Sequence, residues 1–121
     1  MSTDSKRALA SATVTGTILQ LAMVLSGHWI SVIKMNVFAI GGMAISLVAG
    51  VLYARMARAP RGVAAMNGAI AGGVCALIGI AVSFGLGDVP AAVLGFGTLS
   101  SAVTGAIGGA VAGTSRAAAR A

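Results

Sequence analysis

The stretch GVAAMNGAIAGGVCALIGIAVSFGL, residues 62–86, decides the fold because it is a long apolar run without Asp, Glu, Lys or Arg. A helix needs about 20 such residues to cross the hydrocarbon core of a bilayer. Three other runs of this kind fill most of the remaining chain, at residues 9–33, 35–54 and 90–113. The pattern predicts an all-α polytopic membrane protein, a four-helix transmembrane bundle that forms one membrane domain over residues 1–121.

The composition of the whole chain agrees with this fold class. Of the 121 residues, 58% are hydrophobic and only 8% are charged, whereas about 25% are charged in an ordinary soluble domain. This balance excludes a water-soluble globular protein. Lys6 and Arg7 precede the run at 9–33 in the manner of a signal peptide, but that run is too long for a signal sequence, so we interpret it as a retained helix.

The basic residues carry a topology signal. Seven of the eight Lys and Arg residues fall in the tails at 1–8 and 114–121 and in the link between the second and third runs: Lys6, Arg7, Arg55, Arg58, Arg61, Arg116 and Arg120. Four alternating helices place all of these on one side, and the positive-inside rule then predicts a multi-pass protein of the bacterial inner (plasma) membrane with cytoplasmic termini. We expect these residues to contact anionic lipid headgroups, at about 1 kcal/mol each. Nucleic-acid binding is not expected, because no basic stripe with interleaved aromatic residues exists.

The glycines are spaced for helix packing. Apolar side chains drive little association in lipid, so transmembrane helices associate through close contact of their backbones at small residues four positions apart. The predicted packing residues are Gly16, Gly42, Ser46, Gly50, Gly68, Gly72, Gly105, Gly109 and Gly113. The spacing does not say whether these faces meet within one chain or between copies. Paired glycines also permit bends, although we favour packing.

Two groups of polar residues lie at helical spacing. Thr13, Thr17 and Gln20 share one face of the first run, and the fourth run presents a similar face with Thr98, Ser101 and Thr104. One interpretation is that the two faces line a water-filled path. The other, which we favour, is that these groups bond to their own helix carbonyls or to a neighbouring helix.

Five further residues have simple structural interpretations. We expect Trp29 and Tyr53 to be aromatic anchors at the two membrane interfaces. Asp88 is predicted to cap the fourth helix, with Pro90 in the first turn of that helix. Cys75 is the single cysteine of the chain, and we interpret it as a small packing residue.

The sequence favours association over catalysis. It contains no paired carboxylates, no nucleophile with a base, no phosphate-binding loop and no metal-ligand cluster, so we expect neither an enzyme nor a cofactor. The first hypothesis is a structural or accessory membrane protein that associates with itself or with a membrane complex through its small-residue faces. The alternative is a small oligomeric channel or transporter lined by the polar faces of the first and fourth helices. A holin-like lytic role also fits the small size and basic tail, although no residue singles it out.

Overall fold

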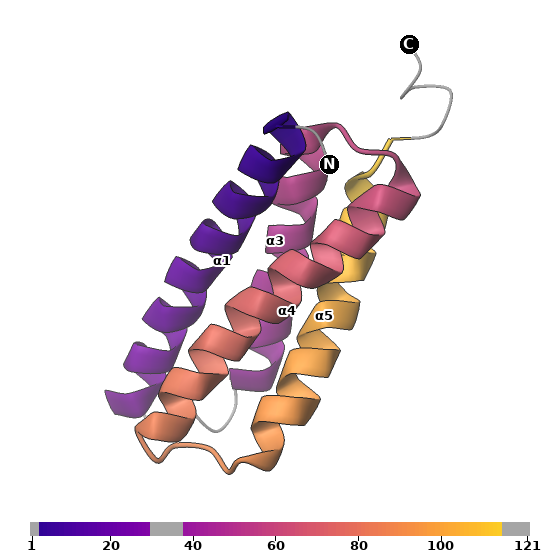
Figure 1. The fold of residues 1–121 in the computed structure, drawn as a ribbon. Coiled ribbons are helices and arrows are strands. Elements are labelled where there is room, and N and C mark those ends of the chain that lie inside the picture. Colours follow the sequence, from indigo (N-terminus) through magenta and orange to yellow (C-terminus); the bar gives the residue numbers. More distant parts are fainter. Residues whose placement is uncertain (1–2, 30–37, 115–121) are drawn as a thin grey trace.

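The described part of the chain consists of helices and short links. A computed structural model describes residues 3–29 and 38–114. It contains four helices (Figure 1): α1 (Thr3–Trp29), α3 (Phe38–Ala57), α4 (Arg61–Gly85) and α5 (Ala92–Ala112). Each helix is long and apolar enough to span a membrane. The predicted all-α four-helix bundle is therefore confirmed.

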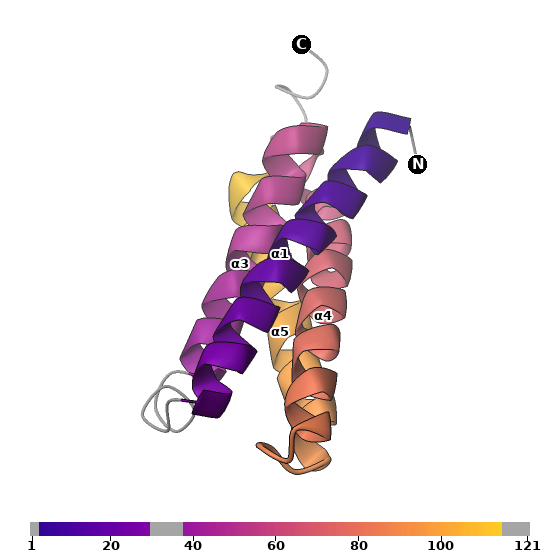
Figure 2. The same cartoon turned by 90° about the vertical axis from the view of Figure 1, so that its left-hand side faces the viewer.

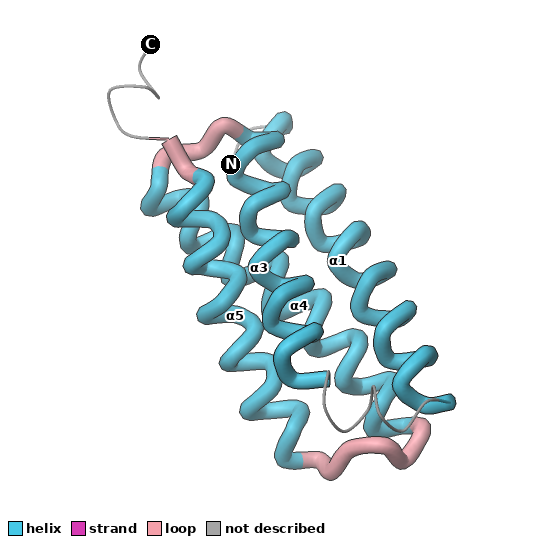
Figure 3. The backbone as a smooth tube through the Cα atoms, turned by 180° about the vertical axis from the view of Figure 1, so that it is seen from behind, coloured by secondary structure: helices cyan, strands magenta, loops and turns pink. Residues whose placement is uncertain are grey.

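The helices alternate in direction, so the start of α1 and the end of α5 lie at the same end of the bundle (Figures 1 and 3). The most extensive packing is between α4 and α5, and α3 contacts all three other helices. Toward the end away from the termini, the α1/α3 pair diverges from the α4/α5 pair (Figure 2).

The observed helix bounds differ from the predicted ones at several ends. The predicted residues 30–33 of the first helix and 35–37 of the second lie outside the described residues. Helix α3 continues to Ala57, beyond the predicted end at residue 54. The bounds of α4 and α5 differ from the predicted ones by one or two residues at each end.

The predicted capping role of Asp88 is wrong. The residue at the N-cap position of α5 is Ala91, without a side-chain hydrogen bond, and Pro90 precedes the helix. The backbone N–H of Asp88 instead donates to Ser83 O at 3.0 Å. The chain needs these residues to reverse direction after α4, with Gly87 in the left-handed region at φ 79°, where glycine is favoured. Asp88 therefore belongs to the turn and lies too early to cap α5.

Backbone hydrogen bonds join the residues that follow α3 to Thr114, which follows α5. Arg58 follows α3 with φ 50°, and Ala59 N–H donates to Ala54 O at 3.4 Å. Thr114 N–H donates to Ala59 O at 2.9 Å, and its own carbonyl accepts from Arg61 N–H at 3.1 Å. These bonds hold the end of α5 against the α3–α4 link.

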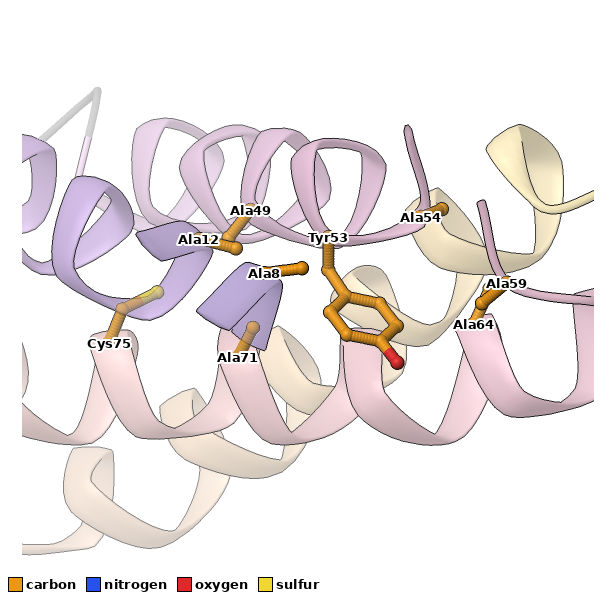
Figure 4. Close-up of a cluster of buried hydrophobic side chains, with 9 residues drawn as sticks. All are labelled: Ala8, Ala12, Ala49, Tyr53, Ala54, Ala59, Ala64, Ala71 and Cys75. Atoms are coloured by element: carbon orange, nitrogen blue, oxygen red, sulfur yellow. The ribbon is translucent and has the colours of Figure 1, made fainter. Parts of the chain in front are cut away.

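The core is built from small side chains. It consists of Ala8, Ala12, Ala49, Tyr53, Ala54, Ala59, Ala64, Ala71 and Cys75 (Figure 4). Large apolar side chains point outward instead, since Ile40, Phe96 and Val111 are 73%, 75% and 74% exposed. This distribution reverses that of a soluble protein, whose large aliphatic residues are mostly inside. It suits a bundle whose solvent is the lipid bilayer.

Candidate functional site in the bundle interior

Glycines bring the backbones of α4 and α5 into direct contact. A Cβ atom added to Gly72 would lie 2.8 Å from Ser101 O and 3.0 Å from Gly105 Cα. A Cβ added to Gly68 would overlap the carbonyl oxygen of Gly105. All of these contacts are closer than ordinary van der Waals contact. A residue larger than glycine at position 68 or 72 would therefore force the two helices apart.

Glycines also bring the backbone of α5 into contact with that of α3. A Cβ on Gly50 would overlap the backbone of α5, and one on Gly108 would overlap Leu47 O in α3. On the neighbouring side of α5, a Cβ on Gly109 would overlap Ala64 O in α4. Helix α5 therefore lies in a groove formed by α3 and α4, and its glycines meet both walls.

Helix α1 packs through a glycine as well. A Cβ on Gly16 would lie 2.9 Å from Cys75 Sγ in α4 and 3.2 Å from Ala49 Cβ in α3. At the end of α5, a Cβ on Gly113 would lie 2.8 Å from Arg61 Cα. These glycine contacts are all made within one chain. For these residues, the small-residue faces therefore meet within one chain, which the spacing alone did not decide.

A buried polar layer crosses the bundle between α1, α3 and α4. Gln20 Nε2 donates to Gly42 O at 3.1 Å and to Ser46 Oγ at 3.4 Å. Ser46 Oγ donates in turn to Gly72 O at 3.2 Å. Cys75 Sγ, which lies 3.9 Å from Gln20 Nε2, also donates to Gly72 O at 3.3 Å. We call Gln20, Ser46 and Cys75 the polar layer. The polar layer joins α1, α3 and α4 through hydrogen bonds. The sequence predicts two of its members, Ser46 and Cys75, to be packing residues.

A second polar cluster surrounds Tyr53 near the termini. The tyrosine is fully buried, its hydroxyl accepts from Asn67 Nδ2 at 2.7 Å, and it shares a hydrogen bond with Ser5 Oγ at 2.6 Å. The prediction that Tyr53 is an anchor at the membrane interface is wrong, because its hydroxyl lies inside the bundle and is hydrogen-bonded to Ser5 of α1 and Asn67 of α4. Trp29, the other predicted anchor, is 81% exposed.

Four of the six residues predicted to line a water-filled path do not line a common cavity. Thr17 Oγ1 and Thr98 Oγ1 are buried and have no hydrogen-bond partner among the described residues. Thr104 Oγ1 donates to the carbonyl of Ser100 in its own helix at 2.7 Å, as the second interpretation predicts. Thr13 is partly exposed.

The remaining two, Gln20 and Ser101, line one cavity of about 400 Å³. All four helices contribute to this cavity, and most of its wall is apolar: Met23, Val24, Met43, Ile80 and Phe96 belong to it. Asp88, from the α4–α5 link, is the carboxylate of the lining. Its lining residues come from the second half of α1, the start of α3, the second half of α4 and the first half of α5, so the cavity lies in the half of the bundle away from the termini. Toward the termini, glycine contacts bring the helix backbones together.

The described basic residues gather at the end of the bundle that holds the termini (Figure 1). Those exposed there are Lys6, Arg7, Arg55, Arg58 and Arg61, whereas Arg116 and Arg120 lie outside the described residues. Arg7 and Arg58 line a surface depression of about 390 Å³ together with Asp4. This arrangement presents positive charge at the level where a lipid headgroup region would begin.

The fold alone defines the class of this protein. Among residues 3–29 and 38–114, no three His, Cys, Asp or Glu side chains gather where they could hold a metal ion. No family model, curated protein or solved structure matches the chain. The helices define a multi-pass membrane protein with four candidate transmembrane spans.

Proposed function

We propose that the chain is an accessory component of the bacterial inner membrane, a closed four-helix unit without catalytic activity that associates through its outer surface. The observation that carries this proposal is the glycine packing within one chain. Because α5 fills the groove between α3 and α4, the small-residue faces are already occupied and the unit is complete before it meets a partner. Copies of the chain, or another membrane protein, then contact its larger side chains.

The outer face of α5 is the surface we assign to this association. Only 22% of the α5 span is buried inside the bundle, compared with 44% of α4. Leu99, Val103 and Ile107 are 68%, 60% and 52% exposed, and their spacing of four places them on one stripe of the helix. Such a stripe gives a neighbouring helix a row of side chains to pack against.

The experiment is native mass spectrometry of the protein extracted into nanodiscs. We expect the chain with copies of itself or with another membrane protein, and we expect the Leu99→Ala/Val103→Ala variant to lose that assembly. The matched control is Val14→Ala/Ile18→Ala, which trims exposed residues of α1 and leaves the assembly intact. An isolated chain in every preparation contradicts the proposal.

Lipid headgroups are the second kind of partner we propose. Arg7 and Arg58 are exposed beside one depression, and each cation near an anionic surface contributes about 1 kcal/mol. In the same spectra, we expect anionic lipids to be retained preferentially over zwitterionic ones, and Arg7→Gln/Arg58→Gln to reduce that preference. Equal retention of both lipid classes removes this part of the proposal.

A small transporter is the second candidate function. It is supported by the cavity, which brings Gln20 of α1 and Ser101 of α5 together in the bundle interior, where transporters place their substrate sites. A carrier would move solute into proteoliposomes at a rate that Gln20→Leu lowers. The accessory role instead predicts the same leakage for wild-type proteoliposomes and for empty liposomes.

A further inference from the structure

We propose that the cavity between the helix pairs binds a neutral, mainly apolar molecule with one hydrogen-bond donor, which bonds to Gln20 Oε1. This inference goes beyond the accessory role, because it assigns a ligand to the inside of the unit. It rests on the orientation of one buried amide, on the chemistry of the cavity wall and on the charge of the lining.

The amide of Gln20 is held in one orientation. Its Nε2 donates to Gly42 O and to Ser46 Oγ, which uses both amide hydrogens. The Ser46 hydroxyl gives its own hydrogen to Gly72 O, so its oxygen is free to accept from Gln20. Exchanging the amide nitrogen and oxygen would place two acceptors together at Gly42. The oxygen Oε1 therefore points away from these partners.

The oxygen lacks a donor within the described chain. All hydrogen bonds of Gln20 to described residues use Nε2, although the side chain is only 2% exposed. A Cβ on Gly42 would lie 3.6 Å from Oε1, and Gly42 and Gln20 both line the cavity. Oε1 is not among the fully buried atoms that lack a partner, so it is accessible from the cavity that Gln20 lines, and a molecule there can donate a hydrogen bond to it.

The wall of the cavity specifies the rest of the ligand. Met23, Val24 and Ile80 offer apolar surface, whereas a buried water needs two to four polar partners. An apolar body with a single hydroxyl or amide N–H therefore matches the site better than water does. Methionine side chains also adapt to ligands of different shape.

The charge of the cavity lining narrows the chemical class of the ligand further. None of the described residues that line the cavity is Lys, Arg or His, so a fatty acid or another anion would find no cationic partner there. An ammonium group bonded to Gln20 Oε1 would lose most of its hydration against a mainly apolar wall, which is unfavourable. A neutral alcohol is the favoured chemistry. Both a free small alcohol and a membrane diacylglycerol carry it.

The test is photolabelling of the protein in phosphatidylcholine nanodiscs with a trifluoromethyl-diazirinyl benzyl alcohol, followed by peptide mapping. We expect saturable labelling of Met23, Val24, Val93 and Phe96, which line the cavity. The methyl ether of the same probe has no donor, and we expect about two- to tenfold weaker saturable labelling with it, the ordinary effect of one hydrogen bond. Competition by octanol or by dioleoylglycerol then identifies the free or the lipid source, and competition by neither overturns the site.

Two glycine variants isolate the role of Gln20 Oε1. Gly42→Ala places a methyl group 3.6 Å from that oxygen at ordinary contact distance, so the fold is retained while the oxygen is shielded. We expect it to weaken saturable labelling by the alcohol about two- to tenfold and to leave labelling by the ether unchanged. Gly95→Ala is the control, because a Cβ there meets nothing within 4 Å.

Three further results would overturn the proposal. The first is labelling that does not saturate and is spread over lipid-facing residues such as Ile18 and Leu99. The second is equal labelling by the alcohol and the ether, and the third is equal labelling of the Gly42→Ala and Gly95→Ala variants. If Gly42→Ala does not fold, Ser100→Leu fills the cavity from α5 and must abolish saturable labelling. The association and flux assays are separate readouts, so failure here leaves the accessory role standing.

Discussion

The substitution Gly109→Ala tests how closely α4 and α5 are packed. The added methyl group would overlap the carbonyl oxygen of Ala64 in α4. That oxygen belongs to a helix backbone and cannot rotate away as a side chain would, so the two helices must separate. Gly95→Ala makes the same chemical change in the same helix, but its methyl group meets nothing within 4 Å.

The magnitude follows from the comparison of the two variants. Both gain the same helix propensity, about 1 kcal/mol for Ala over Gly, so this gain cancels between them. Overpacking a well-packed interior costs about 1–3 kcal/mol, and only Gly109→Ala incurs that cost. We therefore expect the free energy of unfolding of Gly109→Ala to be about 1–3 kcal/mol below that of Gly95→Ala.

The assay is reversible unfolding in bicelles, followed by circular dichroism during a denaturing-detergent titration or by steric trapping. Both variants are measured under one set of lipid conditions, because only the difference between them carries the argument. Equal free energies of unfolding for the two variants would refute the close packing of α4 against α5.

Three further substitutions address the polar contacts and the α3–α4 link. Gln20→Leu removes the hydrogen bonds of the polar layer and should lower the free energy of unfolding by about 0.5–1.5 kcal/mol, the range for such bonds in membranes; a more stable variant contradicts this. Tyr53→Phe leaves the buried Asn67 amide without its partner and should cost about 1–3 kcal/mol, whereas the double variant with Asn67→Leu should recover part of that loss. Arg58→Gly relieves a side chain at φ 50°, a conformation that costs about 1–2 kcal/mol, while the greater freedom of unfolded glycine offsets about 0.5–1 kcal/mol of that gain. The free energy of unfolding should therefore rise by roughly 0.5–1 kcal/mol, and an unchanged value shows that the strain is absent.

The membrane bundle could be predicted because its signals are local and strong. Four uncharged apolar runs admit few other structures, and spacings of four define helix faces whatever they contact. The end of a helix is a weaker signal. Asp88 has the right residue type for a cap, but the turn after α4 uses it before α5 begins.

The partners of the buried polar groups could not be predicted, because they depend on the rotation of each helix about its axis. Tyr53 resembles an interface anchor in sequence, and only the approach of Asn67 from α4 makes it a buried acceptor. The same holds for Gln20, whose partners on α3 and α4 are distant in the chain. The cavity needs side chains from all four helices and from the α4–α5 link, a combination for which the glycine spacing gives no signal.

The central claim is that the small-residue faces meet within one chain, and disulfide trapping between α4 and α5 tests it most directly. The Cβ positions of Gly73 and Ala102 are 3.2 Å apart, close to the about 3.5–4.5 Å of a disulfide. In a Cys75→Ala background, the Gly73→Cys/Ala102→Cys double variant should form a disulfide and retain the mass of one chain. When the two single variants are co-expressed, they should form no disulfide with each other. A disulfide-linked dimer of the two single variants would contradict the claim, because this face would then lie between copies.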